Sequence, residues 1–394
     1  MVDAATLATV VVAGLASLFM AWAIGAGSSG ATPFAPAVGA NAISVMRAGF
    51  IVGILGFAGA VLQGANVSEA VGRELIGGVT LSPIAATVGL SIAAVLVAAG
   101  VFKGYPIATA FTVTGAVIGV GLAMGGDPAW PKYREIASLW VLTPFVGGGI
   151  AYATARLLRD ERIPETVLIP TLAGIIGLLT ANIEFVLLGP PGESQSVATT
   201  AAESLPLSPT VGAALSSLAL ALVVALALAF DMQRDAEAAQ RRFLLVLGGL
   251  VAFSAGGSQV GLAIGPMLPL LEPFAVPLTA ALVGGGAGLL LGSWTGAPRM
   301  IKALSQDYSS LGPRRSIAAL IPSFAIAQAA VFFGIPVSFN EIIVSAIIGS
   351  GYAAGGSGVS GRKMLFTVLA WVASLTTAVV AGYAGFLGVD AIVS

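Results

Sequence analysis

Two related stretches decide the fold: Gly104-Tyr105-Pro106-Ile107 and, 230 residues later, Gly334-Ile335-Pro336-Val337-Ser338-Phe339-Asn340-Glu341. The second lies between two apolar segments that are too short to cross a bilayer separately. Because proline ends one helix and can open the next, this pattern predicts a re-entrant helical hairpin. The first stretch predicts a second hairpin of the same kind.

Further matches occur at almost the same offset. Gly25–Ser28 resembles Gly256–Gln259, and Trp140-Val141 matches Trp371-Val372, in each case 231 residues apart. Glycine- or proline-interrupted segments at corresponding positions of two halves indicate an inverted-repeat transporter, with its site where the repeats meet. We expect residues 1–162 to form the first transmembrane repeat and residues 243–394 the second. Residues 163–242 would supply connector helices and a basic cytoplasmic loop.

The composition is that of a membrane protein, with 57% hydrophobic residues, 9% charged residues and a mean hydropathy of +0.99. Soluble domains carry roughly 25% charged residues, so a water-exposed globular protein is excluded. Ten to twelve stretches approach the length of about 20 apolar residues that a crossing needs, and they are continuously apolar rather than alternating. We expect an all-α polytopic membrane protein with about 10–12 transmembrane segments, re-entrant hairpins included.

Several classes of site are excluded by residue types that the sequence lacks. Cysteine and histidine are both absent, and the net charge is −1. Disulfides, Cys/His metal sites and a basic surface for nucleic acid are therefore not expected. No nucleophile elbow or phosphate-binding loop occurs, so we expect neither an enzyme nor a cofactor. The first apolar run follows Met1-Val2-Asp3 rather than a basic leader, and we expect it to be retained as a helix.

Basic residues gather in three loops, which the positive-inside rule assigns to the cytoplasm. They are Arg156, Arg159 and Arg162; Arg234, Arg241 and Arg242; and Arg299, Lys302, Arg314 and Arg315. The segment Gly189–Ser208 contains no Lys or Arg and is expected outside. We expect a multi-pass protein of the plasma membrane.

The glycine-rich segment Gly25–Pro33 has two interpretations. Small residues let membrane helices pack closely. They can equally end a helix at membrane depth, where exposed N–H groups make an anion site. Its repetition at Gly256–Pro266 favours the second interpretation.

Glu341 lies within the second hairpin motif. An acidic residue at membrane depth is functional by default, although a carboxylate at an aqueous mouth is the alternative. The position that corresponds to Glu341 in the first hairpin is Phe111.

At these residues the sequence resembles the inorganic phosphate transporter (PiT) family. That family carries paired Asn-Asp-Val-Ala-Asn signatures, each followed by a Gly-x-Pro-Val-Ser-Thr-Thr-His hairpin motif. Here Phe253-Ser254 leads to Ala263-Ile264-Gly265-Pro266 as in the second signature, and Gln63–Glu69 is similar to the family's Gly-Ala-x-Val-Ser-Glu stretch. The resemblance covers both halves and suggests a homodimer.

Departures from the signature are systematic. Gly27 and Ser28, and likewise Ser258 and Gln259, stand where the resemblance would place Asn-Asp, while Phe111 and Glu341 replace the histidines. Phosphate near neutral pH keeps a proton and favours an acceptor such as a carboxylate, whereas sulfate needs only donors. Since the signature acids are missing, the sequence is most similar to the sulfate-permease branch of the family.

We therefore expect a secondary transporter of a small inorganic oxyanion, with sulfate as the first candidate and phosphate as the alternative. Neutral hydrogen-bond donors would bind the anion, and its transport would be coupled to H⁺ or Na⁺. A transport-inactive homologue that acts as an anion sensor or scaffold is a third hypothesis. Glu341 is the expected coupling residue. The expected substrate-binding residues are Gly27, Ser28, Ser29, Thr109, Gly257, Ser258, Gln259, Ser338 and Asn340.

Overall fold

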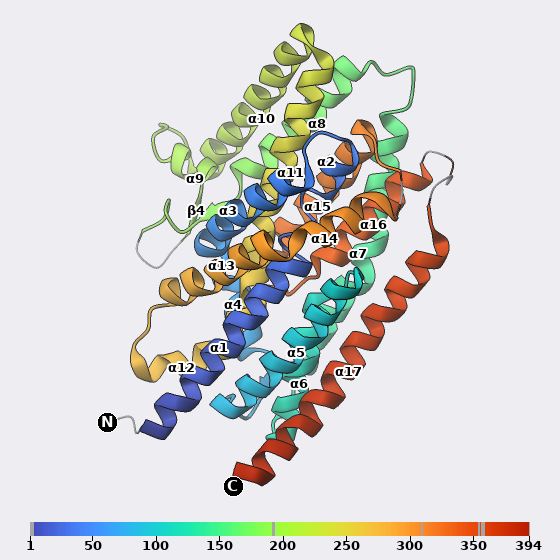
Figure 1. Ribbon diagram of the computed structural model, residues 1–394. Helices are drawn as coiled ribbons and strands as arrows, with labels where there is room; N and C mark the ends of the chain where they lie inside the picture. The colour runs from blue at the N-terminus through green and yellow to red at the C-terminus, as the bar shows by residue number, and fades with distance from the viewer. Residues whose placement is uncertain (1–3, 191–193, 309, 354, 356–358, 394) are drawn as a thin grey trace.

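Long helices make up almost all of the computed structural model, which describes residues 4–190, 194–308, 310–353, 355 and 359–393. Within these residues nine helices are long and apolar enough to cross a membrane, and two shorter apolar helices accompany them. The prediction of an all-α polytopic membrane protein is confirmed. The start of α1 and the end of α17 lie at the same end of the bundle (Figure 1).

Six helices of the first half recur in the same order in the second half. The first set is α1 (Ala4–Gly27), α3 (Val45–Gln63), α4 (Ala65–Arg73), α5 (Pro83–Lys103), α6 (Thr109–Ala123) and α7 (Trp130–Leu157). The corresponding set is α11 (Ala236–Ile264), α13 (Leu278–Thr295), α14 (Ala297–Gln306), α15 (Pro313–Phe332), α16 (Phe339–Tyr352) and α17 (Gly361–Val393).

Shorter elements and the connector complete the chain. The connector has α8 (Glu165–Ala181), the short α9 (Val197–Ala202) and α10 (Pro209–Arg234). The short helices are α2 (Ala35–Gly39), α12 (Leu268–Leu271) and the 3₁₀ turns η1 (Gly265–Met267) and η2 (Glu272–Phe274). Strand β1 (Ile76–Gly77) pairs antiparallel with β2 (Asp127–Pro128), and β3 (Glu184–Phe185) pairs with β4 (Gln195–Ser196).

The two repeats interlock through glycines that bring helices of opposite halves into contact. A Cβ on Gly256 of α11 would lie 1.9 Å from the carbonyl oxygen of Gly56 in α3, and one on Gly349 of α16 would lie 2.1 Å from that of Gly148 in α7. The corresponding pairs, α1 with α13 and α6 with α17, approach equally closely. Small residues allow this approach between membrane helices, so the halves form one bundle rather than two lobes.

A helical hairpin is present at both predicted places, as α5–α6 and α15–α16, but the expectation of arms too short to cross a membrane was wrong for α5 and α15, which are each long and apolar enough to cross one. Each hairpin turns through a left-handed glycine, Gly104 at φ 71° and Gly334 at φ 62°, before its proline. The first hairpin lies toward the end where α1 starts, and the second toward the opposite end (Figure 1). They are therefore inverted relative to one another, and their tips approach from opposite directions.

Each hairpin tip is held by a tryptophan of the other repeat. Trp140 Nε1 in α7 donates to the carbonyl oxygen of Pro336 at 2.9 Å. Trp371 Nε1 in α17 donates to that of Pro106 at 2.8 Å. Because buried carbonyl groups require a partner, this reciprocal pair fixes the two tips at the centre of the bundle.

Candidate anion site between the hairpin tips

Ser28, at the end of α1, and Gln259, in α11, occupy corresponding positions of the repeats and touch. The Ser28 hydroxyl donates to Gln259 Oε1 at 3.2 Å, and Thr109 at the start of α6 donates to the same oxygen at 2.8 Å. The two hydroxyl oxygens lie 3.3 Å apart, and all three residues have no exposed surface. Two hydroxyl donors thus converge on one buried oxygen.

Side-chain amides tie the hairpin tips to this point. Gln259 Nε2 donates to the carbonyl oxygen of Val337 at 2.6 Å. Asn340 Nδ2 donates to the carbonyl oxygens of Gly27, at 3.0 Å, and Ile107, at 2.7 Å. The end of α1, the middle of α11 and both hairpin tips therefore meet within single hydrogen bonds of one another.

The helices that leave the two tips begin at this meeting point. Their N-cap residues, Ala108 and Ser338, make no side-chain cap. The first backbone bonds to these caps come from Thr112 and Ile342, so the preceding N–H groups of each first turn have no partner within their helix. Two helix N-termini, with their partial positive charge, face the converging hydroxyls.

Buried polar atoms without a partner concentrate here. In the described part of the chain seven buried side-chain atoms lack a hydrogen bond, and four of them belong to the predicted site: Ser258 Oγ, Ser338 Oγ, Asn340 Oδ1 and Glu341 Oε2. Buried polar groups in proteins are normally paired with protein, water or ligand. Ser338, Asn340 and Glu341 are consecutive or nearly so at the second hairpin tip, and Ser258 is next to Gln259 in α11, so this region is the candidate for a polar ligand.

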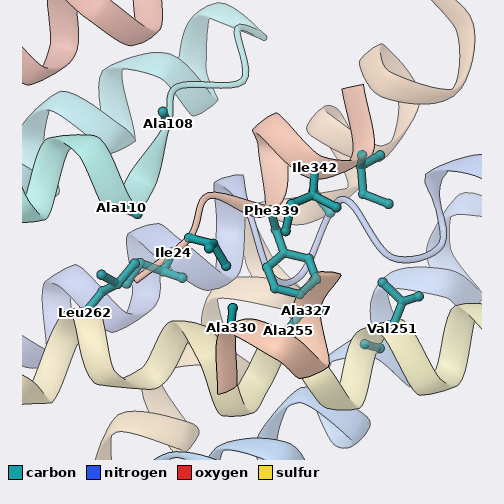
Figure 2. Packing of buried hydrophobic residues seen from close by; sticks show 14 of the residues in the cluster. Ile24, Ala108, Ala110, Val251, Ala255, Leu262, Ala327, Ala330, Phe339 and Ile342 are labelled. Carbon is teal, nitrogen blue, oxygen red and sulfur yellow. The ribbon is translucent and has the colours of Figure 1, made fainter. Parts of the chain in front are cut away.

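Apolar side chains enclose this polar point. Figure 2 shows Ile24 of α1, Ala108 and Ala110 of the first hairpin, Leu262 of α11 and Phe339 of α16 within one cluster of buried residues. Such surroundings keep water out and strengthen electrostatic interactions inside.

Glu341 lies in the first turn of α16 and is 2% exposed. Among the described residues no Lys or Arg makes an ion pair with it. At the corresponding position of the first hairpin, Phe111 stacks on Trp140 with ring centroids 3.9 Å apart. One hairpin thus carries a buried carboxyl group where the other carries an aromatic ring.

The structure corrects the expectation for the second glycine motif. Helix α11 runs unbroken from Ala236 to Ile264, so the helix does not end at Gly256–Gln259 but at the 3₁₀ turn Gly265–Met267. A Cβ on Gly257 would lie 2.8 Å from Cβ of Gln63 in α3. Gly257 therefore allows α11 to pack closely on α3. Its N–H lies inside the regular hydrogen bonding of α11 and is not free for an anion.

Gly27 and Ser29 also differ from the expectation in detail. Gly27 ends α1 as predicted, but it offers its carbonyl oxygen to Asn340 rather than an N–H to an anion. Ser29 follows Ser28 in the turn and is 2% exposed. Thr109, Ser338 and Asn340 lie at the hairpin tips and Gln259 contacts them, with Ser258 next to Gln259 in α11, although the amide groups of Gln259 and Asn340 already bind backbone.

Sequence reasoning missed the two tryptophan contacts. The repeated Trp-Val pairs did mark equivalent positions, but no spacing in the sequence indicates that an indole will bind a proline carbonyl in the opposite repeat. It also missed a polar contact beside the site, where Gln328 Nε2 donates to Ser254 Oγ at 2.6 Å and to Gln63 Oε1 at 3.3 Å.

Comparisons with known proteins give one family. The model of the phosphate transporter family matches residues 5–382. The inorganic phosphate transporter 2-1, chloroplastic, of Arabidopsis thaliana is 26% identical over 92% of this chain and 69% of its own length. A protein of Pyrococcus horikoshii that carries the name phosphate permease is 25% identical over 92% of this chain and 93% of its own.

A solved structure, "The sodium-dependent phosphate transporter", has the same fold, with a TM-score of 0.82 at 23% identity over 98% of this chain and 100% of that one. The relatives are named for phosphate, so the expected likeness to a sulfate-permease branch is not supported. The match to the family model spans both repeats and the connector. The chain is a multi-pass membrane protein that belongs to the phosphate transporter family.

Proposed function

We propose that this chain carries inorganic phosphate across the membrane, in symport with a cation, through the point where the two hairpin tips meet. The observation that carries the proposal is the set of buried, unpartnered polar atoms around two uncapped helix N-termini. Helix N-termini bind anions through free N–H groups and the helix dipole. The opposed hairpins suit transport, since each closes the site toward one side of the membrane.

Ser28 and Thr109 would donate to the anion. Both hydroxyls point at Gln259 Oε1, and a phosphate oxygen in place of that oxygen would receive the same two hydrogen bonds. Ser258 and Ser338, whose hydroxyls are unpartnered, would complete the coordination.

Glu341 distinguishes phosphate from sulfate in this proposal. Hydrogen phosphate carries a P–OH group that can donate, and Glu341 Oε2 is a buried acceptor without a partner in the first turn of α16. An ionised carboxylate would accept this proton but would repel the fully deprotonated sulfate dianion. The phosphate names of the relatives support the same choice.

Coupling to a cation is part of the proposal. The solved structure of the same fold is titled sodium-dependent, which makes Na⁺ the first candidate. Protonation of Glu341 is the second, because a neutral carboxyl group tolerates an entering anion that a charged one repels. We further propose that this transport takes place in the plasma membrane.

Sulfate transport is the second candidate. It is favoured by the neutral donors Ser28 and Thr109, which lie at the meeting point without an acid in the signature positions. An oxyanion that only accepts hydrogen bonds would be satisfied by these donors alone.

Uptake into proteoliposomes tests the proposal. Labelled phosphate should enter in preference to labelled sulfate, and a sodium gradient should increase the rate. Ser338→Ala should raise the phosphate concentration for half-maximal uptake about 10- to 100-fold, the loss of one hydrogen bond to a charged group. Ser323→Ala is the matched control, since this buried hydroxyl binds the Ala319 carbonyl in its own helix at 2.7 Å.

A clear preference for sulfate would establish the second candidate instead. Binding of phosphate without uptake of either anion would identify the transport-inactive sensor or scaffold.

A further inference from the structure

A cavity separate from the candidate anion site lies at the end of the bundle where the three basic loops gather, which we call the basic end. It has a volume of about 400 Å³. Its walls come from the end of α7, the starts of α8 and α11, and the segment that leads into α15. Three arginines and one acid line it: Arg159, Arg314, Arg315 and Glu165.

The charges in this cavity are not balanced. Arg314 pairs with Glu165, whose other oxygen accepts from Gln240 Nε2 at 3.1 Å. Arg315 Nη1 donates to Ser310, to its carbonyl oxygen at 2.6 Å and its hydroxyl at 2.8 Å. In the described part of the chain neither Arg159 nor Arg315 has a carboxylate within 4.0 Å.

The two uncompensated arginines also act on one another. Arg159 lies close enough to Arg315 for like-charge repulsion, although Arg159 lies in the turn after α7 and Arg315 in α15. The acid that follows Arg159, Asp160, instead accepts from the backbone N–H of Arg162 at 3.0 Å. Two guanidinium groups that face one cavity without an acid between them are stabilised by a shared anion, because each can bind it through paired N–H donors.

The start of α15 adds to this field. Its N-cap, Gly312, offers no side-chain cap, and the helix continues for 20 residues, to Phe332. Its free N–H groups and dipole favour an anion at the same wall of the cavity.

We propose that this cavity binds a phosphate group, presented either by the headgroup of an anionic phospholipid or by a free phosphate anion. Guanidinium pairs match the geometry of phosphate oxygens. The cavity lies where membrane-crossing helices begin, at the end that the positive-inside rule assigns to the cytoplasm, and basic residues at that level attract anionic headgroups. A bound phosphate would link α7 to α15, the helix that leads to the second hairpin tip.

The experiment is native mass spectrometry of the full-length protein in detergent, with phosphatidylglycerol and phosphatidylcholine offered together. The wild type should retain phosphatidylglycerol in preference. The double variant Arg159→Gln/Arg315→Gln should retain it about 10- to 100-fold less, the loss of two charge-assisted contacts. The control Arg156→Gln/Arg162→Gln removes the same charge from the end of α7 and the same loop, at residues that do not line the cavity, and should behave as wild type.

Inorganic phosphate distinguishes the two sources. If phosphate does not displace the lipid from the wild type, the ligand is a lipid headgroup. If phosphate displaces the lipid from the wild type but not from Arg159→Gln/Arg315→Gln, the ligand is a free anion. The charge-preserving variant Arg159→Lys/Arg315→Lys should retain an intermediate amount, because lysine keeps the charge but not the paired donors.

Equal retention by the cavity variant and its control would overturn the proposal. Because this readout measures binding alone, its failure is distinct from a failure of phosphate uptake.

Discussion

The two hairpins have one backbone design and different chemistry. Each turns through a left-handed glycine, and each proline carbonyl is bound by a tryptophan of the opposite repeat. The first tip continues with Ala108 and Phe111, while the second continues with Ser338 and Glu341. Phe111 packs against Trp140, whereas Glu341 is buried with an unpartnered oxygen.

This difference indicates a division of roles. The shared features position the tips, so they are kept in both repeats. The polar features needed for an anion are unequal: the first repeat supplies the hydroxyls of Ser28 and Thr109, and the second repeat supplies Gln259, Asn340 and Glu341. The first hairpin therefore provides a hydroxyl donor and a helix N-terminus, and the second provides the acid.

Replacing Glu341 should have the largest effect on phosphate uptake and should separate the roles of the two hairpins most clearly. Glu341→Gln removes a charged acceptor but keeps the shape, and a hydrogen bond to a charged group contributes about 1.5–3 kcal/mol. We expect phosphate uptake to fall about 10- to 100-fold, with its dependence on pH reduced. The matched change in the first hairpin, Phe111→Leu, should alter uptake less than about 5-fold, since it loses about 0.5–1 kcal/mol of ring stacking. Equal losses in both variants, measured in proteoliposomes, would show that the acid has no special role.

Removing the tryptophan contacts tests the features that the hairpins share. Trp140→Phe and Trp371→Phe each leave a buried proline carbonyl without its donor, which costs about 1–3 kcal/mol. The two variants should lower the thermal unfolding temperature by similar amounts. The double variant should show nearly the sum of the two, because the contacts involve different tips. A large fall for one and none for the other would contradict the two-fold equivalence.

The contact between Ser28 and Gln259 joins corresponding positions of the repeats. A double-mutant cycle with Ser28→Ala and Gln259→Ala, read out as the phosphate concentration for half-maximal uptake, should give a coupling of about 1 kcal/mol, or roughly 5-fold. Additive effects would mean that the two residues act at separate places.

Alanine at the turn glycines should have the smallest effect. Both have positive φ, which costs an L-residue about 1 kcal/mol. Gly334→Ala should destabilise more than Gly104→Ala, because its Cβ would lie 3.1 Å from the Asn66 carbonyl oxygen, while nothing lies within 4 Å at Gly104. Thermal unfolding of both variants checks this order, and a larger loss at Gly104 would contradict it.

The hairpins, the repeat and much of the site could be predicted from the sequence because their signals are local. Gly-x-Pro between short apolar segments specifies a turn, and one constant offset specifies two copies. The continuity of α11 could not be predicted, because Gly256 and Gly257 are held in a helix by the backbone and side chains of α3. The use of Asn340 as a donor to Gly27 and Ile107 was hidden for the same reason, since its partners come from other segments. The expectation of sulfate rather than phosphate was based on the acids that are missing from the signature positions. Glu341 supplies an acid from the second hairpin instead.

The most direct test of the central claim is protection of an introduced cysteine by substrate. Since the chain has no cysteine of its own, Ser28→Cys provides a single thiol at the meeting point of α1, α11 and the hairpin tips. We predict that phosphate slows its modification by a methanethiosulfonate reagent, at concentrations that also saturate uptake, and leaves Ser194→Cys in the exposed loop unaffected. Equal rates of Ser28→Cys modification with and without phosphate, in a variant that still takes up phosphate, would contradict the account.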